Sequence, residues 1–237
     1  RYIGDPGFQS GVAEDVGVAR STVCDTVWFV AQSIAGQAEN WITFPSTAVN
    51  LENAKTRWQE RYRFRHAIGA INCTHIQIKK PYLHGDEYIN RKGVASINVQ
   101  ATCNSKEEFT SVDATWPGSV HDSRILRNSD VWRVMTGNDT NAVLLGDVGY
   151  GITPWLMTPY QNVNPPEQRA YKNCISREQV IIERCFGQVT QRFPIQNKML
   201  ATDRIPSCSF SSSFTSRCRV CMDPPPPLIS IPCHPPQ

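Results

Sequence analysis

The chain has 237 residues, of which 40% are hydrophobic, and a formal net charge of +3 at pH 7. This length suits one medium-sized domain with an appendage, and the hydrophobic content is enough to form a buried core. The small net charge excludes a chain that is strongly basic throughout, so any surface that binds nucleic acid must be local. Basic residues do cluster in four places: Arg61, Arg63 and Arg65; Lys79 and Lys80; Arg91 and Lys92; Arg124 and Arg127. For any one cluster alone, a solvated charged face is the simpler interpretation.

The cysteine pattern favours a reducing compartment. The chain has nine cysteines, an odd number, and those in the first 190 residues are scattered among apolar neighbours. That pattern is typical of free buried thiols and not of a disulfide framework. The first residues show no signal-peptide pattern, and no apolar stretch is long enough to cross a bilayer. We therefore expect the nucleus, with the cytoplasm as the other location, and no membrane partner.

Residues 1–65 form a region that the sequence predicts to be helical. Apolar residues at helical spacing predict a helix over 11–18 and a second one from Arg20, with Gly17 at the turn between them. Ser21 or Thr22 can cap the second helix. This order is typical of a helix-turn-helix, in which the start of the second helix faces a DNA groove or the phosphates.

An ordinary helical hairpin packed on the core is the alternative interpretation of that region. Short helix-turn-helix patterns are common by chance, so on this segment alone the ordinary hairpin is the favoured interpretation. A further helix is expected over 51–62, after the loop at Phe44 and Pro45.

Residues 66–200 have the pattern of an α/β domain. Strands are expected over 67–78, 96–103, 109–114 and 142–145, and helices over 121–135 and 177–192. Three strands, a helix, a strand and a later helix predict a mixed sheet flanked by helices.

Residues 201–237 form a tail rich in proline, serine and cysteine. A segment of this composition sustains neither helical nor strand periodicity, so we expect it to be disordered. Its Cys218, Cys221, Cys233 and His234 make an incomplete zinc-ligand set, which does not favour a zinc site.

Three polar residues mark a candidate site. Asp147 follows the apolar strand, Glu183 interrupts the apolar face of the last helix, and Asn72 lies in the first strand. Two carboxylates and a third oxygen suit a hard divalent cation such as Mg²⁺ or Mn²⁺, and such ions activate water in phosphodiester cleavage. The structural alternative is that Asp147 caps a turn while Glu183 pairs with Arg184 or Arg177; the pattern alone leaves both open.

An ordered series of motifs resembles the PIF/Harbinger transposases and their domesticated, nuclease-like relatives. It consists of AIGAINCTHI (67–76), YINRKG (88–93), WPGSVHDSRIL (116–126), LLGDVGY (144–150) and IIERCFG (181–187). The resemblance covers most of residues 1–200 and also includes the N-terminal helical region. It implies an RNase H-like fold with a helix-turn-helix-like region before it.

The resemblance also implies a metal-binding Asp-Asp-Glu triad. Carried over position by position, Asp147 is the second acid and Glu183 the third, while the first position holds Asn72. His121 and Asp122 match another motif of the family. They are candidates for accessory residues of the site, but capping of the helix that begins there is the favoured role.

The implied function is cleavage of DNA phosphodiester bonds with Mg²⁺ or Mn²⁺, weakened because Asn72 lacks a negative charge. The alternative is a catalytically inactive, domesticated protein that binds DNA or a protein partner. The resemblance suggests a separate Myb/SANT-like DNA-binding partner and allows a homo-oligomer. The residues expected to contact DNA are Arg20, Ser21, Thr22, Arg91 and Lys92.

Overall fold

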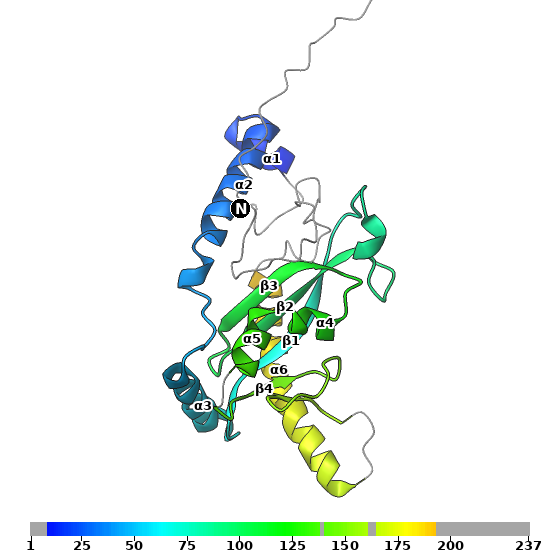
Figure 1. Ribbon diagram of the computed structural model, residues 1–237. Helices are drawn as coiled ribbons and strands as arrows, with labels where there is room; N and C mark the ends of the chain where they lie inside the picture. The colour runs from blue at the N-terminus through cyan, green and yellow to red at the C-terminus, as the bar shows by residue number, and fades with distance from the viewer. Residues whose placement is uncertain (1–8, 138–139, 161–164, 193–237) are drawn as a thin grey trace, which may run out of the picture.

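The computed structural model describes residues 9–137, 140–160 and 165–192 (Figure 1). The expected tail over 201–237 lies outside the described residues. In chain order the elements are α1 (Gln9–Val16), α2 (Arg20–Ala35), the 3₁₀ helix η1 (Ala38–Asn40), α3 (Ala48–Tyr62), β1 (Ala67–Gln77), the 3₁₀ helix η2 (Gly85–Tyr88), β2 (Ser96–Cys103), β3 (Phe109–Pro117), α4 (Asp122–Arg127), α5 (Asp130–Thr136), β4 (Val143–Gly146), β5 (Leu156–Met157) and α6 (Pro166–Arg192).

The five strands form one mixed sheet with the order β3-β2-β1-β4-β5. Strands β1, β2 and β3 form an antiparallel meander, whereas β4 lies parallel to β1 and β5 lies parallel to β4. Because β1 and β4 are parallel, the chain between them has to cross over, and it does so through β2, β3, α4 and α5. The mixed α/β sheet predicted from the sequence is thereby confirmed.

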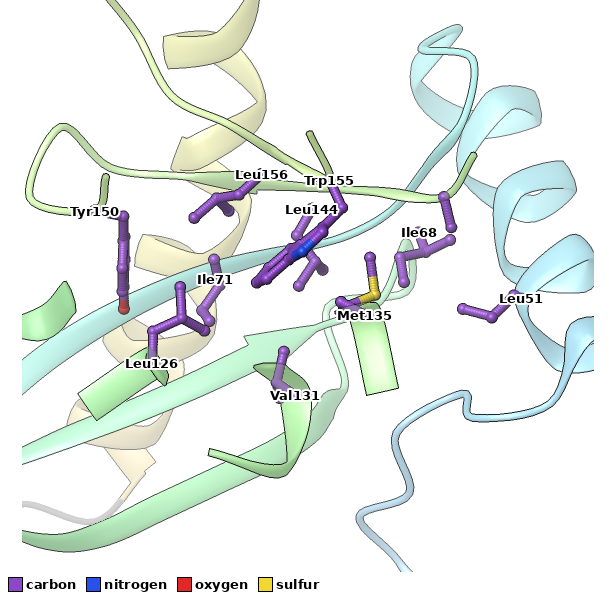
Figure 2. Close-up of a cluster of buried hydrophobic side chains, with 11 residues drawn as sticks. Leu51, Ile68, Ile71, Leu126, Val131, Met135, Leu144, Tyr150, Trp155 and Leu156 are labelled. Carbon is purple, nitrogen blue, oxygen red and sulfur yellow. The ribbon is translucent and has the colours of Figure 1, made fainter. Parts of the chain in front are cut away.

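Each face of the sheet has its own hydrophobic core. On one face, side chains from α4, α5 and the segment after β4 pack on Ile68, Ile71 and Leu144 (Figure 2). In this view α6 lies behind the strands. On the other face α6 packs on the small side chains of the central strands. That second core consists of Trp58, Ala67, Ala70, Ala101, Cys103, Leu145, Ile175, Ile181, Ile182 and Cys185. Helix α3 contributes to both cores, through Leu51 to the first and Trp58 to the second.

The N-terminal helices have the predicted helix–turn–helix order. Gly17 lies in the turn with φ +71°, a left-handed conformation that glycine adopts at little cost, and α2 begins at Arg20. The predicted cap at Ser21 or Thr22 is wrong, because Ala19 occupies the N-cap position and no side chain caps the helix. Figure 1 shows α1 and α2 at one end of the molecule, leading away from the sheet.

Helix α6 is longer than the sequence predicted. It has 27 residues and begins at Pro166, eleven positions before the expected start at 177. Proline suits the first turn of a helix, because the first amide groups have no intrahelical acceptor. Although α6 is long, no helix in the described part of the chain is both long and apolar enough to cross a membrane.

The helix expected over 121–135 is in fact two helices, α4 and α5, separated at Asn128 and Ser129. Ser129 ends the first and starts the second: its Oγ donates to the Leu126 carbonyl at 2.7 Å and accepts from the Trp132 amide at 3.2 Å. Serine competes in this way with the helical backbone, which makes it a better cap than an interior residue. The two-residue strand β5 was not predicted either.

We predict that Ser129→Ala lowers the free energy of unfolding by about 1 kcal/mol, because the first turn of α5 loses its side-chain acceptor. Urea denaturation followed by circular dichroism measures this. Ser129→Asp keeps an acceptor at the same position, so its free energy of unfolding should fall by no more than about half of that amount. Equal losses in the two variants would contradict the capping role.

Candidate functional site

Asn72 and Asp147 are neighbours where the parallel pairing of β1 with β4 ends, in the middle of β1 and directly after β4. The last paired residues of β1 and β4 are Ile71 and Gly146, so Asn72 and Asp147 come next on their two chains. Neighbouring strands are about 4.8 Å apart, which makes these two residues direct neighbours. Ala70 and Leu145, two positions earlier, both belong to the core under α6. Since side chains alternate along a strand, Asn72 and Asp147 belong to that same face.

Both side chains make local hydrogen bonds. Asn72 Oδ1 accepts from the Cys73 amide at 2.8 Å, and Asp147 Oδ1 accepts from the Val148 amide at 2.6 Å. The Asp147 carbonyl also accepts from the Tyr150 amide at 3.1 Å, so this residue does cap a turn, as the structural alternative proposed. Capping does not exclude metal binding, because an ionised carboxylate has about four acceptor sites.

Glu183 lies on the stretch of α6 that crosses the sheet. Gln179 Nε2 donates to the carbonyl of Gly146, which anchors α6 at the end of β4. Two turns later the Phe186 ring packs against Phe109 of β3, with the ring centroids 5.7 Å apart. Glu183 falls between these two contacts along the helix. Being four residues after Gln179, it projects from the same flank of the helix.

Glu183 does not interrupt the apolar face of α6, and that part of the prediction is wrong. Its side chain is exposed, next to the buried Ile182. The acid that does interrupt the buried face is Glu178, which is 2% exposed. The two arginines expected to pair with Glu183 pair with other acids. Arg177 pairs with Glu178 at 3.3 Å, and Arg184 pairs with Glu107 at 3.1 Å.

Glu178 is the carboxyl group most affected by burial among those near α6. Burial raises its pKa, and the neighbouring Arg177 guanidinium only partly opposes this. Glu178 Oε1 accepts from Arg177, whereas Oε2 is buried without a hydrogen-bond partner. A half-satisfied buried carboxylate is costly, so its position in the fold calls for an explanation.

The loop that carries Asp147 is held in place from the opposite face of the sheet. Tyr150 is buried and its hydroxyl lies 3.1 Å from Cys73 Sγ on β1. Gly149 leaves room for Asp122, because a Cβ atom at position 149 would lie 3.0 Å from Asp122 Oδ2. Asp122 Oδ1 in turn accepts from Asn98 Nδ2 at 2.9 Å. Burial raises the pKa of both Tyr150 and Cys73, so both stay protonated and neutral near pH 7.

His121 and Asp122 act at the start of α4. His121 is the N-cap, and its Nδ1 accepts from the Ser123 amide at 3.3 Å. The capping role that was favoured for this pair is therefore observed. Asp122 adds a contact to the loop after β4, but it approaches from the face opposite α6.

The residues expected to contact DNA lie in two separate places. Arg91 and Lys92 are exposed in the loop between η2 and β2. Burial is the largest cause of the lowered pKa of His75, and the Asp122 carboxylate opposes it. Arg91 and Lys92 lower this pKa further, so both cations lie near this part of β1. Arg20, Ser21 and Thr22 are exposed at the start of α2, away from the sheet (Figure 1).

The predicted ligands at positions 72, 147 and 183 are oxygen donors with less negative charge than a triad of three acids would have. Within the described ranges no group of three or more His, Cys, Asp and Glu side chains is arranged to hold a metal ion. With Asn72 in the first position the set has two carboxylates and one amide oxygen, which are hard ligands of the kind that Mg²⁺ and Mn²⁺ prefer. Their combined charge of about −2 neutralises a single dication.

Comparison with known proteins assigns the chain to a class. The DDE superfamily endonuclease family matches residues 71–215, which is more than half of the chain, and the chain belongs to this family. Its mixed sheet flanked by helices is the RNase H-like architecture of these endonucleases.

Individual proteins also match the chain. The protein named "Putative nuclease HARBI1" is 27% identical over 187 residues in both rat and human, which is 78% of this chain and 54% of the relative. The "Protein ALP1-like" of Arabidopsis thaliana is 28% identical over 177 residues, 68% of this chain and 43% of that protein. The chain thus spans about half the length of the curated relatives it matches, and no solved structure matches it.

The raised pKa of Glu178 predicts a pH-dependent loss of stability. The folded protein binds this proton more tightly than the unfolded chain, in which the pKa of the group is near 4.5. Stability therefore falls as pH rises through the folded pKa. We expect Glu178→Gln to be more stable than the wild type at pH 7 by about 1–3 kcal/mol, because it removes a half-satisfied buried charge. The gain should shrink below pH 4.5.

Thermal unfolding at a series of pH values, compared between wild type and variant, measures this gain. Glu183→Gln, an exposed acid on the same helix, serves as the control and should show no such trend. A gain that is independent of pH would contradict the assignment of the effect to Glu178 ionisation.

Proposed function

We propose that the chain is a divalent-metal-dependent DNA endonuclease of transposase origin, in which Asp147 and Glu183 hold Mg²⁺ or Mn²⁺ and Asn72 supplies a third, neutral oxygen. The pairing of β1 with β4 carries the proposal, since it makes Asn72 and Asp147 neighbours on the face crossed by α6. The Gln179 bond to Gly146 supports the third position, because it fixes α6 against the end of β4 one turn before Glu183.

The chemistry divides between the ion and the chain. A bound divalent ion would supply a Lewis acid for the phosphate and lower the pKa of a water nucleophile. Asp147 and Glu183 orient that ion from the strand end and the helix. Both side chains are exposed, so a duplex can approach them directly from solvent. The cations Arg91 and Lys92 lie near the same strand and would contact backbone phosphates.

Asn72 sets the level of activity in this proposal. An amide oxygen can ligate a cation but adds no negative charge, so a second dication would be held weakly. The missing carboxylate would cost on the order of several kcal/mol of transition-state stabilisation, which corresponds to orders of magnitude in rate. The fold does not depend on the charge, because Asn72 is half-buried and its Oδ1 bonds to the adjacent amide.

The second candidate function is a catalytically inactive DNA-binding or partner-binding protein that keeps the scaffold. The substitution at position 72 favours it, because it removes charge from the proposed metal site without disturbing the core. In either case the proposed location is the nucleus, and the proposed partners are DNA and a separate Myb/SANT-like DNA-binding protein. The exposed start of α2 at Arg20, Ser21 and Thr22 is the second proposed DNA contact.

We predict that Asn72→Asp strengthens Mn²⁺ binding at least tenfold, a gain of about 1.4 kcal/mol or more, because it restores the missing charge. Isothermal titration calorimetry with Mn²⁺ measures this in the full chain. Asn128→Asp makes the same chemical change at an exposed position at the end of α4, and should leave the affinity unchanged. Equal affinities in Asn72→Asp and Asn128→Asp would count against a metal site at position 72.

Nicking of supercoiled DNA with Mg²⁺ or Mn²⁺ separates the two functions. If the chain is an endonuclease, the wild type nicks slowly, Asn72→Asp nicks at least tenfold faster, and Glu183→Ala or Asp147→Ala abolishes nicking. If neither the wild type nor Asn72→Asp nicks DNA with either metal, the endonuclease proposal is wrong and the binding protein remains.

A further inference from the structure

A pocket rich in arginine lies between α3 and α6, on the flank of α6 opposite Glu183. Its volume is about 360 Å³. It is lined by Arg61, Tyr62, Arg63, Arg177, Glu178, Ile181 and Arg184. Below it is called the α3–α6 pocket. The metal site proposed above uses none of these residues.

The charges of the α3–α6 pocket leave an excess of positive charge. Four guanidinium groups line it, and two acids pair with them: Glu178 with Arg177, and Glu107 with Arg184. Arg61 lies over the Tyr62 ring, with its Cζ 5.7 Å from the ring centroid, and also hydrogen-bonds to the Tyr62 side chain. A guanidinium has five N–H donors, so this bond leaves others for a ligand. Arg61 and Arg63 are exposed. The pocket therefore offers planar donors to an anion.

The floor of the α3–α6 pocket is rigid. Ile181 is 1% exposed and belongs to the core under α6. Tyr62 packs on Trp58 with ring centroids 5.0 Å apart, and its hydroxyl donates to the Ser105 carbonyl at 3.2 Å. Arg63 ends α3 in a left-handed conformation with φ 58°, which turns the chain sharply at the pocket. Guanidinium groups held on such a floor lose less freedom when a ligand binds.

Glu178 gives the α3–α6 pocket a feature that stability alone does not explain. Its carboxyl group is buried, holds Arg177 through one oxygen, and leaves the other oxygen without a partner. An apolar residue would cost less in the wall of a core helix. The functional explanation is that this acid is a positioning residue, which orients the exposed Arg177 guanidinium at the pocket mouth.

The α3–α6 pocket lies near the start of β1, and the proposed metal site lies at the middle of that strand. The pocket residues Arg61 to Arg63 come just before the first residue of β1, Ala67, whereas Asn72 is about 16 Å further along the strand at about 3.3 Å per residue. This separation is shorter than one turn of duplex DNA, about 34 Å. Helix α6 contributes to both sites, with Glu183 on one flank and Arg177 and Arg184 on the other.

We propose that the α3–α6 pocket binds a backbone phosphate of duplex DNA at a distance from the bond that is cut. The proposal rests on DNA being the substrate, as proposed above. Arginine forks match the paired oxygens of a phosphate, which lysine or a neutral amide does not do as well. A phosphate contact of this kind sets the register of the duplex on the protein and does not read its sequence.

Fluorescence anisotropy with a short labelled duplex tests the pocket without requiring catalysis. The double variant Arg61→Gln/Arg63→Gln removes two of the four guanidinium groups and should weaken duplex binding about tenfold at low salt. The slope of log affinity against log salt should fall by about 1–2, since each phosphate that the protein neutralises adds about 0.9 to it. Arg61→Lys/Arg63→Lys keeps the charge, so it should keep the salt slope while the affinity falls less than in the glutamine variant.

The matched control is Arg57→Gln/Arg65→Gln. It removes the same charge from exposed neighbours that do not line the pocket, and should change the affinity less than twofold. If both double variants weaken binding equally, a diffuse basic surface explains DNA binding and the pocket proposal is overturned. The same holds if the wild type binds no duplex at low salt.

Two further arms separate the pocket from other sources of the effect. The first arm is a titration of wild type and Arg61→Gln/Arg63→Gln with inorganic phosphate or an acidic phosphopeptide. The proposal is overturned if the variant no longer binds these ligands but binds DNA as tightly as the wild type. The nicking assay distinguishes this proposal from the endonuclease proposal: weaker DNA binding in the pocket variant supports the pocket even if no variant of the chain cuts DNA.

Discussion

The parallel pairing of β1 with β4 is the constraint on which the rest of the structure depends. It joins segments about 75 residues apart, from Ala67↔Val143 to Ile71↔Gly146, and a hydrophobic core forms on each side of this pair. The small residue Gly146 is needed at the end of it, because a Cβ atom there would lie 2.9 Å from Leu156 and 3.2 Å from both Ile71 and Tyr150. The next residue on each chain, Asn72 or Asp147, is the first that is free of the core.

Helix α6 is the second constraint, because it connects the two ends of the sheet. Its buried residues pack on Ala67, Ala70 and Leu145, whose small or apolar side chains let the helix approach closely. One flank then faces the carboxyl end of the central strands through Gln179 and Glu183. The opposite flank faces α3 through Arg177 and Arg184. A shift of α6 would therefore change the metal site and the α3–α6 pocket together.

The sequence predicted the elements whose pattern is local, and missed those set by tertiary contacts. Strand β2 was predicted with its observed bounds because its residues alternate and a turn follows directly. The break at Ser129 was missed because the residues on either side keep helical spacing and only the cap geometry shows two helices. Strand β5 has two residues, too few for any periodicity, and exists only because β4 offers it an edge.

The same distinction applies to the candidate site. Asp147 could be recognised because it follows an apolar strand, and Glu183 because a motif carries it. Which acid on α6 is buried could not be read from the sequence, since Glu178 and Glu183 each have an arginine as a direct neighbour and isoleucines within four residues. The direction of the buried helix face depends on the sheet beneath. A cluster of Arg61, Arg63 and Arg65 looked like a solvated face, yet two of the three line a pocket once α6 supplies the opposite wall.

Position 72 shows why fold and catalysis can be lost separately in such a chain. Asn72 fits the strand as well as an aspartate would: it pairs with Ala101, and its amide oxygen bonds to the next backbone amide. Exchanging one for the other removes a charge but no packing, so nothing in the core selects against it. In the proposed site the cost would fall on metal binding alone. If the functions proposed above hold, a scaffold of this kind would keep its sheet, its α6 and its arginine pocket, and with them the proposed DNA contacts, after losing the charge proposed to support rapid cleavage.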